Sequence, residues 1–461
     1  MVDIQLQIWK HRALHGSIEL SKDDLRSTTE TDSNLAIIRI SQEARLMNNK
    51  VFNLLSACVF TLIAGNAAAQ DQTPIRIAYI DPLTGSFSAT GYNALRQFEF
   101  AVEELVNSKG GVLGGRKLEI VPYDNKGSAQ ESQLQLRRAI SEGFQFILQG
   151  NSSAVAGVLT EAINRHNRRN TDQRLLYINY AAVDPALTNQ NCNFWHFRFD
   201  AHADMKMQAL TDMIAQRPEI TRVYIIGQDY SFGKSVSESA VVMLKKKRPD
   251  IQIVGNELHP MEQVKDFTPY VTKIVSSGAD AIITGNWGAD MVSLGKAITD
   301  AGIKSPIFTY YAAYDGISST IGQSGLDQFR MVHEGYFNPA PTEEFAKYIR
   351  DFKQRYPNND ISYPRVINTV QMLAKAIEAA GSTDPEAVAM QLENMEITTI
   401  SGDRIFMRAD DHQLFQPIQI SVHTNEGITF DADNSGYGLR TEVSVPLENT
   451  MVEHSCSMVR P

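Results

Sequence analysis

Residues 75–111 read IRIAYIDPLTGSFSATGYNALRQFEFAVEELVNSKGG and change their hydrophobic period along the way. Residues 75–80 form a short apolar run rich in β-branched side chains, which predicts a buried strand. After a turn-like segment, Leu95, Phe98 and Val102 recur at helical spacing until a pair of glycines ends the pattern. The stretch therefore predicts a strand that is followed by a helix.

The alternation of strand and helix continues along the chain. Ser128 and Glu131 form a capping-box pattern that begins another helix, and Gly143 ends it. Residues 412–424 (HQLFQPIQISVHT) alternate apolar and polar side chains, which predicts one strand with a solvated face. The remaining strands are expected at 117–124, 144–150, 175–182, 222–227, 251–257, 280–285 and 306–311. This order predicts an α/β fold with parallel sheets, whose ligands bind beyond the carboxyl ends of the strands.

The composition is that of an ordinary globular protein, with a hydrophobic content of 43% and a charged content of 21%. The formal net charge of −10 argues against a nucleic acid or an anionic membrane as partner, because both favour a basic face. Residues 70–461 are long enough for two domains.

A secretion signal is expected at residues 47–69, within MNNKVFNLLSACVFTLIAGNAAAQ. A single lysine, an apolar run and an Ala-rich end match a signal peptide cleaved after Ala69, although a buried core helix is the alternative. The lipoprotein-like position of Cys58 does not fit, because the apolar run follows the cysteine. Residues 1–46 are interpreted as a non-native upstream extension, with translation starting at Met47, and a genuine leader is the alternative. We therefore expect an unanchored periplasmic protein.

Cys192 and Cys456 are the cysteines that remain after the signal. An oxidising compartment favours one disulfide between them, whereas two unrelated buried thiols are the alternative.

The candidate enzyme motifs do not have the residue spacing that each motif requires. Residues 227–235 (GQDYSFGKS) have the context of a P-loop but place five residues, not four, between the glycines. Residues 150–154 lack the second glycine of a nucleophile elbow. The ten histidines show no metal-ligand spacing. We expect no enzyme, no cofactor and no metal. Ser152 and Ser153 begin a predicted helix, where they either bind an anion or simply cap the helix.

Several segments together resemble the Leu/Ile/Val-binding family, the periplasmic receptors of branched-chain amino acid ABC transporters. In chain order these segments are IRIAYIDPLTGSFSATG, ELVNSKGGVLGGRKLEIVPYDNKGSAQES, RRAISEGFQFILQGNSS, INYAAVDPALT, YIIGQDYSFGKS and LGKAITDAGIKSPIF. Each segment is weak alone, but their order and spacing are specific. They cover nearly all of residues 70 to about 424.

The resemblance implies a type I periplasmic-binding fold, in which two doubly wound parallel-sheet lobes are joined by three crossovers. We place the crossovers near 198–203, 335–340 and 414–420. Lobe 1 is then expected to comprise 70–200 and 338–415, and lobe 2 to comprise 201–337 and 416–461. A monomer is expected that closes a hinge over its ligand and docks on a membrane permease.

The resemblance also implies the ligand site. Ser152 and Ser153 stand where relatives bind the ligand carboxylate, and the backbone of Ala181 and Ala182 would contribute further contacts. The side-chain pocket is expected to be lined by Phe87, Phe232 and Trp287.

Two positions depart from the family pattern. Val183 stands where the amino-acid binders have threonine, and Tyr311 stands where they have the acid that holds the ammonium. We therefore expect a small carboxylate ligand, aromatic acids included. Branched-chain amino acids remain the alternative, with Asp184 or Asp229 as a misplaced acid. A ligand-sensing module of a signalling system is a further alternative.

Overall fold

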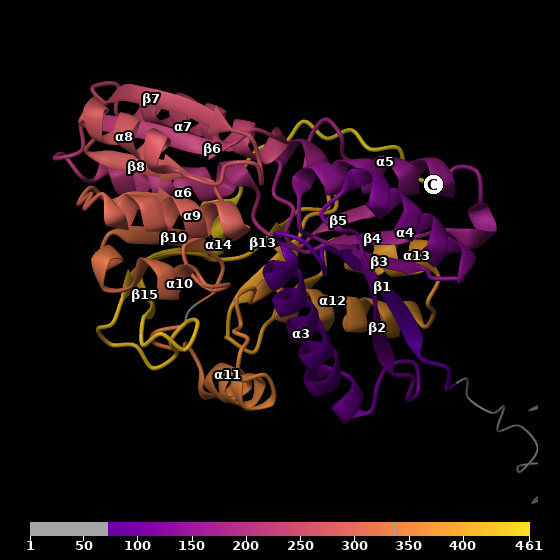
Figure 1. Ribbon diagram of the computed structural model, residues 1–461. Coiled ribbons are helices and arrows are strands. Elements are labelled where there is room, and N and C mark those ends of the chain that lie inside the picture. Colours follow the sequence, from indigo (N-terminus) through magenta and orange to yellow (C-terminus); the bar gives the residue numbers. More distant parts are fainter. Residues whose placement is uncertain (1–71, 336) are drawn as a thin grey trace, which may run out of the picture. The chain divides into compact units, whose positions relative to one another are not determined.

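The computed structural model describes residues 72–335 and 337–461 (Figure 1). The expected upstream extension, 1–46, and the expected signal peptide, 47–69, lie outside the described residues. In the described part, no helix combines the length and the apolar character that a membrane crossing needs.

The first sheet has five strands in the order β2-β1-β3-β4-β5, and all of its pairs are parallel. Its strands are β1 (Ile75–Asp81), β2 (Leu118–Asp124), β3 (Phe146–Gln149), β4 (Leu176–Asn179) and β5 (His196–Arg198). We call this sheet and the helices that pack on it lobe 1. Its helices are α3 (Ser88–Leu105), α4 (Ala129–Ser141), α5 (Ser153–Asn167), α12 (Arg365–Ala380), α13 (Pro385–Leu392) and the short η1 (Asn107–Lys109), η2 (Thr171–Gln173) and η3 (Pro185–Thr188).

The second sheet has seven strands in the order β15-β14-β10-β9-β8-β6-β7. Its strands are β6 (Arg222–Gln228), β7 (Gln252–His259), β8 (Ala281–Thr284), β9 (Ile307–Thr309), β10 (Phe329–His333), β14 (Ile418–Thr424) and β15 (Gly438–Val445). This sheet and its helices form lobe 2. The helices are α6 (Ala203–Ala215), α7 (Ser231–Lys247), α8 (Thr268–Ser277), α9 (Gly288–Asp300), α10 (Ile317–Ile321), η4 (Gly322–Gly325) and α14 (Leu447–Thr450).

A small third sheet and one more helix complete the described part. The sheet is antiparallel, in the order β11-β12-β13. These elements are α11 (Glu343–Arg355), β11 (Glu396–Thr398), β12 (Arg404–Met407) and β13 (Leu414–Phe415).

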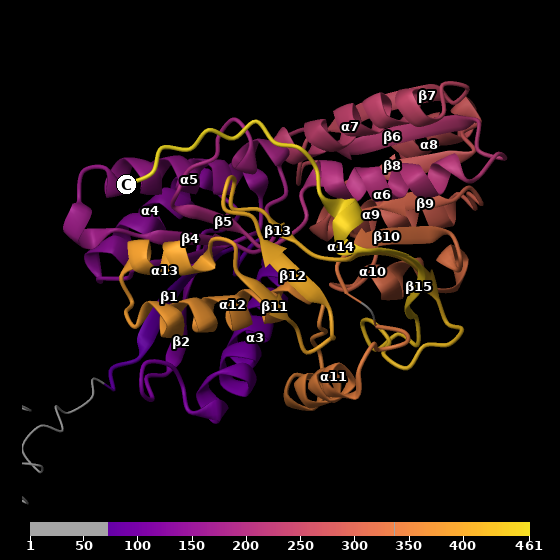
Figure 2. The same ribbon diagram turned by 180° about the vertical axis from the view of Figure 1, so that it is seen from behind.

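The chain passes between the two lobes three times: after β5, after β10, and between β13 and β14 (Figures 1 and 2). The predicted α/β class with three crossovers is therefore confirmed. The predicted lobe boundaries remain a prediction.

One strand prediction is wrong. Residues 412–424 form two strands rather than one, because Gln416 and Pro417 separate β13 from β14 and proline has no N–H for the ladder. No face of β14 is solvated either, since all of its residues are buried. Two of its polar side chains find partners inside: His423 hydrogen-bonds the Gly322 carbonyl at 3.1 Å and stacks on Tyr437, and Ser421 hydrogen-bonds His333 at 2.9 Å.

The C-terminal tail joins the two lobes a fourth time. After α14 it runs from lobe 2 along lobe 1 toward α5 (Figure 2). There a disulfide links Cys192 and Cys456, whose Cα atoms are 5.7 Å apart. Arg460 adds an ion pair to Glu393 at 2.7 Å. The predicted disulfide is confirmed.

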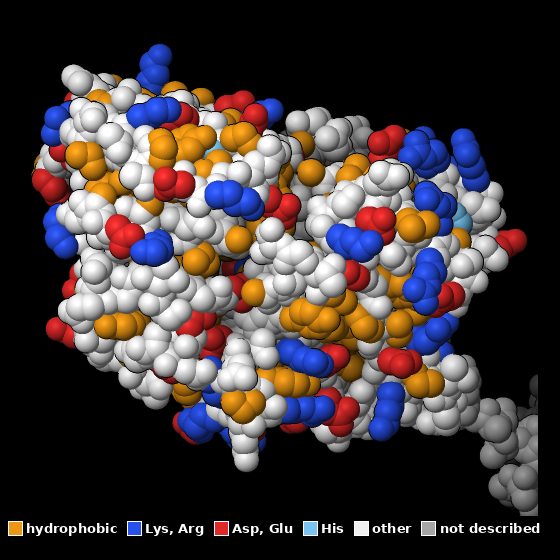
Figure 3. Space-filling view, viewed as in Figure 1, with side chains coloured by type: hydrophobic (Ala, Val, Ile, Leu, Met, Phe, Trp, Pro, Cys, Tyr) orange, Lys and Arg blue, Asp and Glu red, His pale blue; other side chains and the backbone are white. Residues whose placement is uncertain are grey.

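On the face that Figure 3 shows, positive and negative side chains are mixed. Figure 3 shows lysine and arginine interspersed with aspartate and glutamate, with hydrophobic side chains in patches between them.

Candidate ligand-binding site

A pocket lies between the lobes at the carboxyl ends of β3, β4, β6, β8 and β9, where parallel sheets bind ligands. We call it the interlobe pocket. Its empty space, mouth included, is about 300 Å³. The lining residues are Gly150, Asn151, Ser152, Ser153, Ala181, Ala182, Val183, Tyr230, Phe232, Trp287, Tyr311, Tyr363 and Arg365.

The start of α5 forms one wall of the pocket. Ser152 is the N-cap residue, but its side chain makes no capping hydrogen bond, and its φ of 84° is unusual for a residue with a side chain. Ser153 Oγ accepts a hydrogen bond from the Asp184 amide at 3.2 Å. Because the first amides of a helix have no partner within it, this wall offers donors to an anion.

Asp81, at the end of β1, holds that wall in place. Its carboxylate accepts hydrogen bonds from the amides of Gly150 and Asn151 at 3.1 and 2.9 Å, and from the Tyr180 hydroxyl at 2.7 Å. Burial raises the pKa of Asp81 to about 7, although these donors favour its ionised form. Asp81 therefore positions the turn that presents Ser152 to the pocket.

The loop after β4 forms the neighbouring wall. Asn179 fixes it, because its Oδ1 accepts from the Ala182 amide at 2.8 Å and its Nδ2 donates to the Ala182 carbonyl at 2.9 Å. The Val183 carbonyl accepts from the Ala203 amide at 2.8 Å, which connects this loop to the start of α6 in lobe 2.

Aromatic side chains of lobe 2 form the opposite wall. Trp287 Nε1 donates to the Tyr230 hydroxyl at 2.8 Å, and the Phe232 ring meets Tyr311 edge to face at 6.2 Å. Phe87 of lobe 1 stacks on Trp287 with ring centroids 4.0 Å apart, so the lobes touch beside the pocket. A flat apolar surface results, with rings held in fixed positions.

The start of α12 supplies a positive charge. Arg365 is 2% exposed, and its Nη1 donates to Glu334. The buried Lys206 lies 2.9 Å from Asp200 and 4.0 Å from Glu334. Although burial opposes the charge of Arg365, Asp200 and Glu334 raise its pKa. The guanidinium therefore stays charged, and two acids balance the two bases.

The structure brings most of the predicted site residues together. The predicted residues that line the interlobe pocket are Ser152, Ser153, Ala181, Ala182, Val183, Phe232, Trp287 and Tyr311. Phe87 lies behind Trp287 and does not line the pocket.

Two candidate acids lie elsewhere. Asp184 accepts from the Ala186 amide and so caps η3, and Asp229 pairs with Lys234 at 3.2 Å. Neither lines the interlobe pocket.

The expected site did not include five of the lining residues, which are Gly150, Asn151, Tyr230, Tyr363 and Arg365. Gly150 and Asn151 directly precede the predicted serines, and Tyr230 stands two positions before Phe232 in the segment with P-loop context. Tyr363 and Arg365 belong to a Tyr-Pro-Arg segment that leads into α12, where a proline at a helix start was the available signal.

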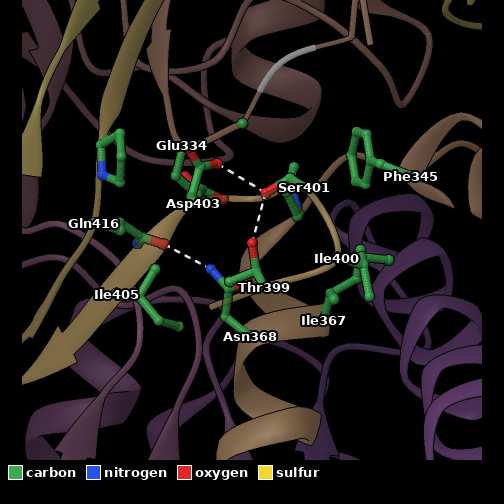
Figure 4. Close-up of a pocket in the computed structure, with 13 residues that line it drawn as sticks. Glu334, Phe345, Ile367, Asn368, Thr399, Ile400, Ser401, Asp403, Ile405 and Gln416 are labelled. Atoms are coloured by element: carbon green, nitrogen blue, oxygen red, sulfur yellow. Dashed lines mark hydrogen bonds between the residues drawn. The ribbon is translucent and has the colours of Figure 1, made fainter. Parts of the chain in front are cut away.

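A second pocket lies between α12, the turn after β11 and the third crossover (Figure 4). Its polar groups bind one another: Asn368 donates to Gln416 at 2.8 Å, Thr399 and Ser401 share a hydrogen bond of 2.7 Å, and Ser401 donates to Asp403 at 2.8 Å. None of the predicted site residues lines it.

Comparison with known proteins agrees with the fold. A family model described as periplasmic binding protein matches residues 74–426. The Leu/Ile/Val-binding protein homolog 4 of Brucella melitensis is 31% identical over 428 residues, which cover 90% of this chain and 100% of that protein.

Solved structures agree as well. The leucine-, isoleucine-, valine-, threonine- and alanine-binding protein of Brucella ovis, in a closed conformation, has a TM-score of 0.75 at 29% identity, covering 84% of this chain and 100% of that one. An ABC-transporter solute-binding protein from R. palustris, in complex with benzoate, shares the fold at a TM-score of 0.68 and 15% identity, covering 83% and 99%. This chain therefore belongs to the Leu/Ile/Val-binding group of the periplasmic binding protein family, whose members serve ABC transporters.

Proposed function

We propose that this protein is the periplasmic receptor of an ABC importer and binds a small apolar carboxylate, aromatic acids included, between its lobes. The ligand carboxylate binds at the start of α5, against Ser152 and Ser153. The apolar part of the ligand packs on Phe232 and Trp287. Closure of the hinge then presents the lobes to a membrane permease.

The charge of the pocket wall is the observation that carries this proposal. Among the described lining residues none is aspartate or glutamate, and Arg365 is the charged one. A buried ammonium without a carboxylate partner is strongly unfavourable, whereas the start of α5 favours an anion. A ring ligand would add roughly 0.5–1.5 kcal/mol of aromatic interaction to the area it buries.

The alternative ligand is a branched-chain amino acid. It is favoured by the printed names of the two Brucella relatives, which are Leu/Ile/Val-binding and leucine-, isoleucine-, valine-, threonine- and alanine-binding proteins. It requires an acid near the ammonium, and both candidates considered from the sequence are engaged elsewhere.

A thermal-shift screen of the purified protein separates the two ligands. Apolar amino acids are compared with benzoate-like and aliphatic acids of similar size. A ligand at one hundred times its dissociation constant stabilises the folded state by about 2.7 kcal/mol. We expect a raised melting temperature with acids that lack an ammonium. Stabilisation by amino acids alone would support the alternative.

A further inference from the structure

Arg365 has more donors than its protein partners use. Nη1 donates to Glu334, and the guanidinium carbon lies 4.2 Å from the centre of the Tyr363 ring. Nε is 3.4 Å from Asp200 but makes no hydrogen bond, and Nη2 has no partner among the described residues. The Nε and Nη2 groups form the edge with which arginine holds oxygen acceptors.

Nε thus keeps Asp200 as its ion-pair partner, and Nη2 is the unpartnered group of a residue that lines the interlobe pocket and is 2% exposed. Burying a charged donor without a hydrogen-bond partner is unfavourable. A ligand that brings an acceptor to this donor is therefore expected to bind more tightly. A ligand in the interlobe pocket can supply an acceptor to this group.

The charge around Arg365 indicates which acceptor fits. Lys206 and Arg365 are already balanced by Asp200 and Glu334, so no second full negative charge is required. A ligand ammonium at this place would face the guanidinium and be repelled. A carbonyl or hydroxyl oxygen satisfies the donors without disturbing the balance.

The acceptor must also lie close to the ligand carboxylate. Ser152 and Arg365 line one small pocket, and its remaining far wall is aromatic.

We propose that Arg365 determines specificity in the interlobe pocket and that the preferred ligand is an apolar 2-oxo or 2-hydroxy acid, whose C2 oxygen accepts from Nη2 of Arg365. This inference rests on the proposed binding of a carboxylate in the same pocket. It goes further, because it names the group beside that carboxylate.

Matched ligands test this inference on the unaltered protein. Calorimetry compares 3-phenylpropanoate, phenylpyruvate, phenyllactate and phenylalanine, which differ at C2 alone, and repeats the comparison with the four-compound series built on 4-methylpentanoate. In at least one series, we expect the 2-oxo or 2-hydroxy acid to bind about 10- to 100-fold more tightly than the plain acid, as for one hydrogen bond to a charged donor. The amino acid should bind most weakly.

Two variants test whether the preference for the oxo acid depends on Arg365. Arg365→Met should bind the plain acid and the oxo acid with affinities within about threefold of each other, because the C2 oxygen loses its donor. Lys206→Met is the matched control: it perturbs the same buried charges but removes no residue that lines the pocket. This control should still bind the oxo acid more tightly than the plain acid. If either variant fails to fold, the ligand series on the unaltered protein still tests the proposal.

The outcomes separate the two proposals. Equal binding of plain and oxo acids by the unaltered protein would overturn the role of Arg365 and leave the carboxylate receptor intact. Tight binding of the amino acids alone would overturn both. A preference that survives in Arg365→Met would also overturn the role of Arg365.

Discussion

At the scale of the residue, replacing Ser152 should change ligand affinity but not stability, because its hydroxyl does not cap the helix. Ser152 makes no capping bond, whereas Ser128 caps α4 by accepting from the Glu131 amide at 3.4 Å. Ser152→Ala should weaken carboxylate binding about tenfold, as for one hydrogen bond to a charged group, with little change in stability. Ser128→Ala is the control and should lower the unfolding free energy by about 1 kcal/mol without affecting binding. Calorimetry and urea unfolding measure both. A loss of stability in Ser152→Ala with unchanged affinity would contradict the assigned role.

His333 makes stability depend on pH. Burial, together with the positive charges of Lys206 and Arg365, lowers the pKa of this imidazole to about 3. Between that value and 6.5, the unfolded chain binds a proton that the folded protein excludes. The contribution of His333 is therefore complete above pH 6.5 and is lost as the pH falls toward 3.

Replacing His333 with glutamine tests this dependence. Between pH 6.5 and pH 5 the variant should lose about 2 kcal/mol less unfolding free energy than the unaltered protein, at about 1.4 kcal/mol for each pH unit. Chemical unfolding at the two pH values measures the difference. Parallel pH profiles would show that His333 titrates normally in the folded state.

At the scale of the element, the sequence predicted best where periodicity and burial agree. The strand at 75–80 and the capping box at Ser128 are found as β1 and the start of α4. The split at Pro417 was missed, because the alternation of residues 412–424 continues across it. Alternation also suggested a solvated face for β14, but all of its residues are buried, and His423 and Ser421 hydrogen-bond inside.

The pocket residues that carry a local sequence signal could be predicted, and those without one could not. Serines at a helix start and aromatic residues after strands carry local signals, and most of them line the pocket. Pro364 marks a helix start beside Arg365, but no local signal indicates that Arg365 is buried, because an isolated arginine is usually exposed. Its burial depends on Asp200 and Glu334, which are distant in sequence and meet it only in the fold.

The C-terminal tail is an element whose attachment is covalent. The disulfide joins residues 264 positions apart, and a closed loop of that length restricts the unfolded chain. Cys456→Ser should lower the unfolding free energy by about 2–5 kcal/mol. Ser457→Ala, at the exposed neighbouring position, is the control and should leave it unchanged. Equal unfolding midpoints for both variants in guanidinium would exclude a stabilising role for the disulfide.

At the scale of the whole molecule, binding should move the lobes as two rigid parts. They are joined by three crossovers and touch beside the pocket through Phe87 and Trp287. Without ligand the lobes should separate at the hinge while each keeps its internal structure. Small-angle scattering should give a smaller radius of gyration with a bound ligand than without one. An identical radius at saturating ligand would argue against closure.

Calorimetry with benzoate-like acids and with leucine, isoleucine and valine tests the central claim most directly. The pocket offers Ser152 and Ser153 at the start of α5 to an anion, and the described residues that line it include no acid for an ammonium. We predict that an aromatic or similarly apolar carboxylate binds more tightly than any of the three amino acids. Tight binding of leucine with no binding of the acids would contradict the account.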